Sequence, residues 1–159
     1  MDPALSHLTV SPELALEFLA VFSRFEFALK VSNLRRPGNG EAKADWAAFA
    51  EAVADTFDPQ RTAQLTHAFV CLTGEPLRHF AVENGALTWR PFNLPEGLSQ
   101  AGRVVRLIKQ VRNNLFHGGK FAPDPWAGSD RDARLIQASL VVLRELLRLS
   151  PRVRAAYVD

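Results

Sequence analysis

The segment 99–119, SQAGRVVRLIKQVRNNLFHGG, decides the fold and also carries the most informative polar residues of the chain. Its apolar residues recur every three or four positions, as on one face of an α-helix. These residues are Val104, Leu107, Ile108, Val111 and Leu115. Gly118 and Gly119 follow the pattern directly and predict that the helix ends near Phe116. The segment therefore predicts an amphipathic helix over 99–116, whose apolar stripe must pack against other helices.

The same segment is basic. Between positions 97 and 123 there is no acidic residue. The basic residues of this stretch are Arg103, Arg106, Lys109, Arg112 and Lys120. Such a local positive field attracts phosphate backbones, which makes these residues candidates for binding RNA. The other interpretation is a solvated basic face, which is common on surface helices.

Arg112, Asn113 and His117 are the candidate catalytic residues. Arginine binds phosphate with a planar fork, and the histidine side chain moves protons near neutral pH. Together they provide the minimum for phosphodiester cleavage without a metal ion. Each also has a purely structural interpretation: His117 as a C-terminal helix cap and Arg112 as a side chain lying along the core edge.

The helical periodicity separates two of these candidates. At about 100° per residue, Arg106, Gln110, Asn113 and His117 share one polar face, within roughly 60°. Arg112 lies about 140° from His117 on a regular helix. The pair therefore requires either fraying at the two glycines or a second subunit that completes the site.

The rest of the chain also predicts helices. Ser11-Pro12-Glu13 is a helix start, and apolar spacing continues it to about position 32, with Glu26 and Lys30 as a surface ion pair. Asp45 caps a second helix, and a third covers about 60–72. The last long helix starts at Ser129-Asp130 and ends at Ser150-Pro151, leaving a short tail over 152–159. The loop at 37–40 is expected to be flexible.

Residues 77–91 interrupt this helical pattern. Asn84-Gly85 lies between two short apolar segments, which is typical of a two-residue β-hairpin turn. The predicted fold is therefore all-α: an antiparallel bundle of four to five helices with a β-hairpin insert near 77–91. With 159 residues, the chain is expected to form a single domain over 1–159.

Composition excludes several classes of protein. The single cysteine, Cys71, excludes an internal disulfide framework, and no His, Cys, Asp and Glu cluster has the spacing of a metal site. No phosphate-binding glycine-rich loop is present, so we expect neither a metal nor a cofactor. The N-terminus lacks the features of a signal peptide, and no apolar run approaches the ~18 residues of a membrane span. We therefore expect a soluble cytoplasmic protein without membrane contact.

The stretch 112–118 resembles the motif of the HEPN superfamily, which consists of small all-α bundles. That motif is an arginine, a polar residue, a short spacer and a histidine near the end of a late helix, and Arg112, Asn113 and His117 match it. Segments 22–30, 45–50 and 131–136 are also similar to uncharacterised bacterial HEPN-like proteins. The hairpin at 77–91 departs from a minimal HEPN bundle.

This resemblance implies a metal-independent endoribonuclease, often a toxin or defence effector, that acts as a homodimer with facing motifs. The expected partners are then RNA, a second copy of the chain, and an antitoxin or other partner protein. The alternative is a non-catalytic helical module that binds RNA or protein, with Arg112 and His117 organising a dimer. A third interpretation is a purely structural dimer.

Overall fold

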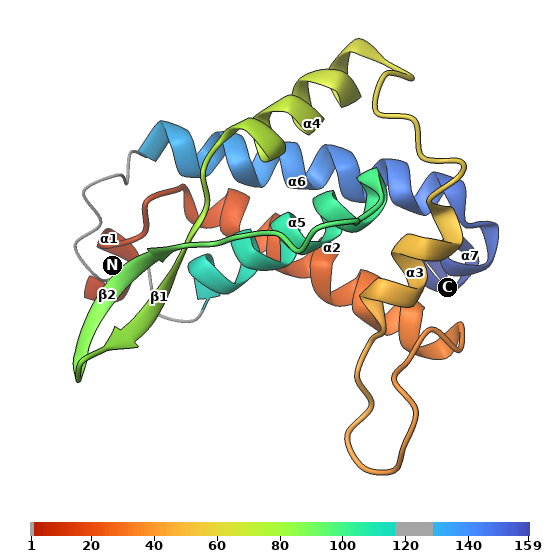
Figure 1. Ribbon diagram of the computed structural model, residues 1–159, viewed down its shortest axis with the longest axis horizontal. Coiled ribbons are helices and arrows are strands. Elements are labelled where there is room, and N and C mark those ends of the chain that lie inside the picture. Colours follow the sequence, from red (N-terminus) through yellow and green to blue (C-terminus); the bar gives the residue numbers. More distant parts are fainter. Residues whose placement is uncertain (1, 117–128) are drawn as a thin grey trace.

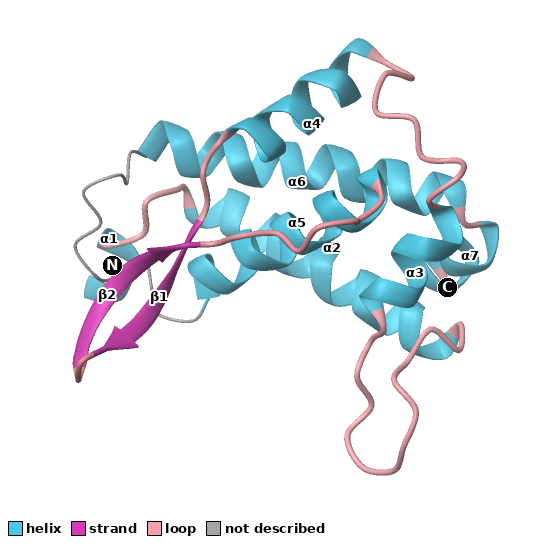
Figure 2. Cartoon of the chain, viewed as in Figure 1, coloured by secondary structure: helices cyan, strands magenta, loops and turns pink. Residues whose placement is uncertain are grey.

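The computed structural model describes residues 2–116 and 129–159 of the chain. The described residues form seven helices and one antiparallel two-stranded sheet (Figures 1 and 2). The helices are α1 (Pro3–Ser6), α2 (Pro12–Val31), α3 (Trp46–Val53), α4 (Ala63–Gly74), α5 (Gln100–Phe116), α6 (Ser129–Leu149) and α7 (Pro151–Val158). The strands are β1 (Arg78–Glu83) and β2 (Ala86–Pro91). The chain is thus mostly helical with a β-hairpin insert. No helix in the described ranges is both long enough and apolar enough to cross a bilayer.

Side-chain caps set where the helices begin. Ser11 Oγ accepts a hydrogen bond from the Leu14 amide at the start of α2, and Asp45 Oδ1 caps α3 in the same way. Both caps were predicted from the sequence. Thr62 Oγ1 caps α4 at the Leu65 amide, so this helix begins at Ala63 and not near 60 as expected. A polar oxygen at this position satisfies an amide that the first turn leaves unpaired.

Three long helices build the core. Figure 1 shows α2 and α5 packed against α6, with α5 running opposite to the other two, while α4 covers α6. The predicted apolar stripe of α5 is buried, and α6 has a buried apolar stripe of its own, formed by Leu135, Ile136, Leu140, Leu143, Leu146 and Leu147. Ser139, the small polar residue within the α6 stripe, is buried and donates to the Leu135 carbonyl at 2.7 Å. The periodicity therefore identified the packed faces correctly.

An aromatic cluster joins α2 to α3. The Trp46 ring stacks on Phe22 and Phe25, with centroids 5.0 and 4.9 Å apart. Trp46 Nε1 donates to Glu26 Oε1 at 3.2 Å, so Glu26 fixes the indole. The predicted Glu26–Lys30 ion pair is wrong, because this carboxylate faces α3. Buried tryptophan usually needs a partner for its N–H, and α2 provides one here.

The hairpin has the predicted turn. Asn84 and Gly85 both have positive φ, at 51° and 78°, as a two-residue turn of this twist requires. Gln110 and Asn114 of α5 hold the start of β1, because both side-chain amides donate to the Arg78 carbonyl, at 3.4 and 2.7 Å. The hairpin thus leans on α5, as a marginally stable two-stranded unit must.

The C-terminal segment differs from the prediction. Residues 152–159 were expected to form a tail, but all of them except the last, Asp159, belong to helix α7, which packs against α2. Pro151 lies at the first helical position, where a missing N–H costs nothing, and Val153 is buried. The Tyr157 carbonyl accepts a hydrogen bond from Arg24 Nε at 2.7 Å. Proline at this place therefore starts a new helix and does not only end α6.

Candidate nucleic-acid interface

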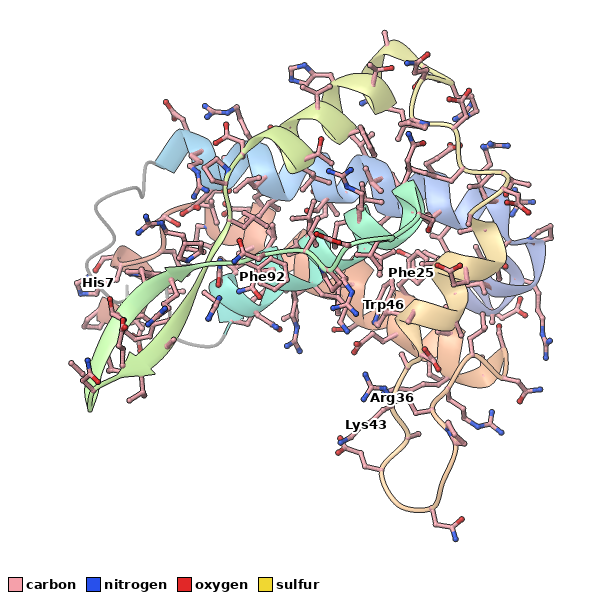
Figure 3. All side chains as sticks on the ribbon, in the orientation of Figure 1. His7, Phe25, Arg36, Lys43, Trp46 and Phe92 are labelled. Atoms are coloured by element: carbon pink, nitrogen blue, oxygen red, sulfur yellow. The ribbon has the colours of Figure 1, made fainter. Side chains whose placement is uncertain are left out.

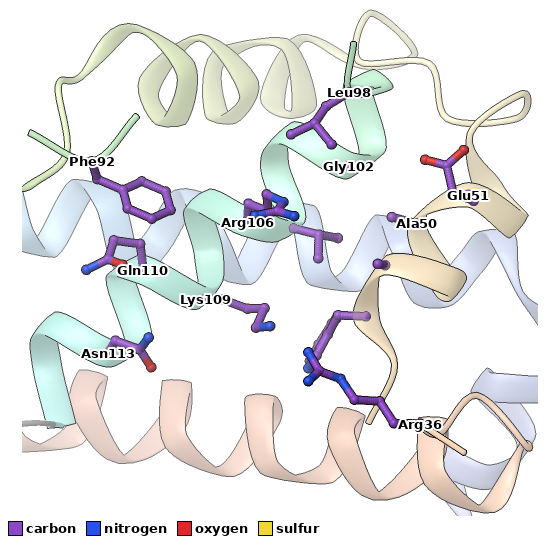
Figure 4. Close-up of a pocket in the computed structure, with 13 residues that line it drawn as sticks. Arg36, Ala50, Glu51, Phe92, Leu98, Gly102, Arg106, Lys109, Gln110 and Asn113 are labelled. Atoms are coloured by element: carbon purple, nitrogen blue, oxygen red, sulfur yellow. The ribbon is translucent and has the colours of Figure 1, made fainter. Parts of the chain in front are cut away.

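A cavity of about 290 Å³ lies between α3 and α5 and opens next to the loop that precedes α3 (Figure 4). We call it the central cavity. Its charged and polar lining comes from Arg36, Glu51, Arg106, Lys109, Gln110 and Asn113. Trp46, Phe92 and Leu98 supply apolar surface. Three of these polar residues, Arg106, Gln110 and Asn113, were predicted to share one face of the helix, and all three line this cavity.

Three cations converge on the central cavity. Arg106 and Arg36 are exposed, whereas Lys109 is half-buried between them. Within residues 2–116 and 129–159 none of the three forms an ion pair. The single carboxylate of the lining, Glu51, has one oxygen 3.5 Å from Ser99 Oγ. The cavity therefore presents excess positive charge in a partly enclosed space, where an anion is bound more strongly than in open water.

The protonation of Lys109 reflects this crowding. Burial lowers the pKa of Lys109, and the nearby positive charges of Arg36 and Arg106 lower it further. The carboxylates of Glu26 and Asp45 act in the opposite direction without cancelling the effect. A phosphate placed in the cavity would remove part of the repulsion between the cations. Perturbed groups in a cavity of this kind are typical of functional sites.

Arg112 follows Lys109 by about one turn of α5 and is half-buried. Its guanidinium carbon lies 5.6 Å from the centroid of the Phe22 ring, a cation–π contact with α2. Arg112 Nη1 also donates to Asn113 Oδ1 at 3.3 Å. Asn113 is exposed and lines the central cavity, so it links Arg112 to the cationic surface.

The two neighbouring asparagines have different environments. Asn114 donates to Arg78 O and accepts a 2.8 Å hydrogen bond from Gln110 Nε2, which holds the hairpin on α5. Of the two, the sequence analysis named Asn113 as a candidate site residue. Only Asn113 faces the cavity, whereas Asn114 anchors β1.

The structure does not bring together all the predicted site residues. Arg103 is exposed and lies on α5, but it does not line the central cavity. His117 and Lys120 lie outside the described residues. His7, His67 and His79, which the structure describes, do not line the cavity either.

Sequence reasoning missed Arg36 and Phe92 as site residues. Arg36 belongs to the loop between α2 and α3, which was predicted only as a flexible connection, and Phe92 follows β2. No local pattern marks either residue, because each reaches the cavity through tertiary packing. By contrast, the basic residues of α5 were predicted from the sequence, because the stretch 97–123 contains no acidic residue.

The chemistry of the site does not include a metal cluster in the described part of the chain. No group of three or more His, Cys, Asp or Glu side chains in that part lies close enough together to hold a metal ion.

Comparisons with protein-family models, with curated proteins and with solved structures found no match.

Proposed function

We propose that this chain is a metal-independent endoribonuclease of the HEPN type, with its long helices as the antiparallel bundle of that superfamily. One observation carries the proposal. Arg112 is hydrogen-bonded to Asn113, Asn113 lines a cavity with three cations that form no ion pair among the described residues, and His117 comes directly after α5 in the sequence. This arrangement supports the proposal, because the cations that would bind phosphate line the same cavity as Asn113, one of the residues that match the HEPN motif.

The reaction needs a proton carrier and a group that stabilises negative charge. The ribose 2′-hydroxyl would attack the adjacent phosphorus, and the P–O5′ bond would break. His117 would take the proton of the 2′-hydroxyl as general base, or protonate the leaving 5′-oxygen as general acid. Arg112 would stabilise the charged phosphorane, and Asn113 would position the phosphate or the imidazole. The products are a 2′,3′-cyclic phosphate and a 5′-hydroxyl, and the need for a 2′-hydroxyl restricts the reaction to RNA.

The biological setting follows from the same resemblance. We propose a cytoplasmic toxin or defence effector that binds RNA, forms a homodimer and is held in check by an antitoxin or other partner protein. Arg103, Arg106, Lys109 and Lys120 would contact the RNA backbone. Arg106 and Lys109 have the strongest support, because both line the central cavity.

The test is incubation of the purified protein with labelled RNA in EDTA. We expect cleavage with a cyclic phosphate end, and His117→Ala should lower the rate by about 10²–10⁴-fold. Arg112→Ala should lower it by about 10²–10³-fold. Arg152→Ala on α7, which removes an exposed arginine, is the matched control and should cleave normally. Cleavage that requires magnesium, or that survives His117→Ala, contradicts the mechanism.

One observation favours the alternative, a non-catalytic module that binds RNA or protein. The Arg112 guanidinium already packs on Phe22 and donates to Asn113, which is also what a structural arginine does. In that case Arg112→Ala lowers stability, and the wild-type protein binds RNA without cutting it. Measuring both binding and cleavage separates the two functions.

A further inference from the structure

A second cavity continues the central one toward the loop at 35–44. It measures about 280 Å³, and we call it the loop cavity. Its charged lining is Glu26, Lys30, Arg36, Glu41, Lys43 and Lys109. Arg36, Trp46 and Lys109 line both cavities. The two hollows are therefore adjacent, and Arg36 and Lys109 lie at their junction.

Cations extend along both cavities. From the α5 end they are Arg106, Lys109, Arg36, Lys43 and Lys30, and none forms an ion pair within the described ranges. Of the carboxylates in the loop cavity, Glu26 is held by Trp46 Nε1, and Glu41 lies on the exposed loop. Five cations against three carboxylates, counting Glu51, leave the combined surface positive.

The neck of the loop is held in place by backbone pairing. Arg35 and Ala44 form an antiparallel bridge, and the Arg36 amide donates to the Lys43 carbonyl at 2.9 Å. The Asp45 amide donates to the Leu34 carbonyl at 2.9 Å. Figure 3 shows Arg36 and Lys43 near each other beside the base of the loop. Opposed residues on paired segments project to the same side, so this pair is positioned before any ligand binds.

We propose that the two cavities form one track for the phosphate backbone of single-stranded RNA, in which Arg36 and Lys43 bind phosphates several nucleotides away from the bond at Arg112. This inference rests on the proposed function. A single strand fits the observations better than a free nucleotide, because two of the five cations, Lys43 and Lys30, lie in the loop cavity, beyond the three that converge on the central cavity. Phe92, half-buried at the central cavity, offers a ring on which a base can stack.

The test uses 2′-O-methyl oligoribonucleotides, which cannot be cleaved, so binding is measured whether or not the protein is a nuclease. Fluorescence anisotropy is recorded against salt concentration for a decanucleotide and a trinucleotide. Two phosphate contacts on a single strand contribute about 1.4 to the slope of log affinity against log salt. The double variant Arg36→Ala/Lys43→Ala should reduce the slope for the decanucleotide by about this amount and weaken binding by about tenfold at low salt.

Three controls make the outcome decisive. Arg36→Lys/Lys43→Arg keeps both charges and should retain the wild-type slope, whereas Arg152→Ala removes a cation outside both cavities and should change nothing. The trinucleotide spans only part of the track, so it should lose less affinity in the double alanine variant than the decanucleotide does. Equal decanucleotide binding by the wild type and the double variant overturns the track, even if RNA cleavage in EDTA succeeds. Binding of a mononucleotide as tightly as the decanucleotide also overturns it and assigns a small-molecule site.

Discussion

Neighbouring polar side chains on α5 have different roles. Asn113 faces the central cavity and Asn114 anchors the hairpin, although the two are adjacent in sequence. Lys109 lies between Arg36 and Arg106, and its pKa is lowered by burial and by the positive charges of these two arginines. Its environment leads to a prediction about pH.

Burial and the neighbouring arginines lower the pKa of Lys109, so it loses its proton at a lower pH than an ordinary lysine. Only the protonated form attracts phosphate, and RNA affinity should therefore fall as pH rises through this lowered pKa. Lys109→Arg keeps the charge throughout the alkaline range and should flatten the decline. The measurement is anisotropy of the 2′-O-methyl decanucleotide against pH, with Lys30→Arg as the control. An equal decline in wild type and Lys109→Arg would rule out this role.

At the scale of elements, the adjacent asparagines allow a matched comparison. Asn114→Ala removes a donor to the part-buried Arg78 carbonyl and should lower the free energy of unfolding by about 1–2 kcal/mol. Asn113→Ala changes an exposed side chain and should stay within about 0.5 kcal/mol of the wild type. Both variants gain the same helix propensity. The difference between their free energies of unfolding therefore reports on the hydrogen bonds of the Asn114 side chain.

Activity should show the opposite order. Asn113→Ala should reduce RNA cleavage by at least about tenfold, whereas Asn114→Ala should leave it close to wild type at temperatures where the variant is folded. Urea unfolding and the cleavage assay in EDTA measure the two effects. If Asn114→Ala is as stable as Asn113→Ala, the hairpin is not held by this amide.

The elements also separate what sequence predicts from what it does not. The helical periodicity of apolar residues, the helix-capping residues and the Asn84-Gly85 turn are local signals. These signals predicted the positions of α2, α3, α5, α6 and the hairpin. The tail at 152–159 was missed because Ser150-Pro151 is equally a stop for one helix and a start for the next. The pairing of Arg36 with Lys43 across the loop was missed because no local sequence pattern marks these two residues as partners. A cavity built by three elements has no signature within any one of them.

The directions of Arg112 on α5 and of His117, which follows that helix in the sequence, determine whether one subunit can form a complete catalytic site. Arg112 packs against Phe22 of α2, while on a regular continuation of α5 His117 would point about 140° away from it. Asn113 and Phe116 at the end of α5 are exposed, so a second subunit has access to this surface. A homodimer with facing motifs would combine the arginine of one subunit with the histidine of the other.

Mixed dimers test this directly. Arg112→Ala and His117→Ala are each expected to be nearly inactive alone, since each lacks one group from every site. A heterodimer of the two, purified by a different tag on each subunit, contains one intact Arg112 and one intact His117 on opposite chains. If the site forms across the interface, the heterodimer should recover RNA cleavage well above either variant, because one complete pair is restored. Light scattering should show a dimer at micromolar concentration. A fully active monomer, or a heterodimer as inactive as its parents, would mean that the two residues act within one chain.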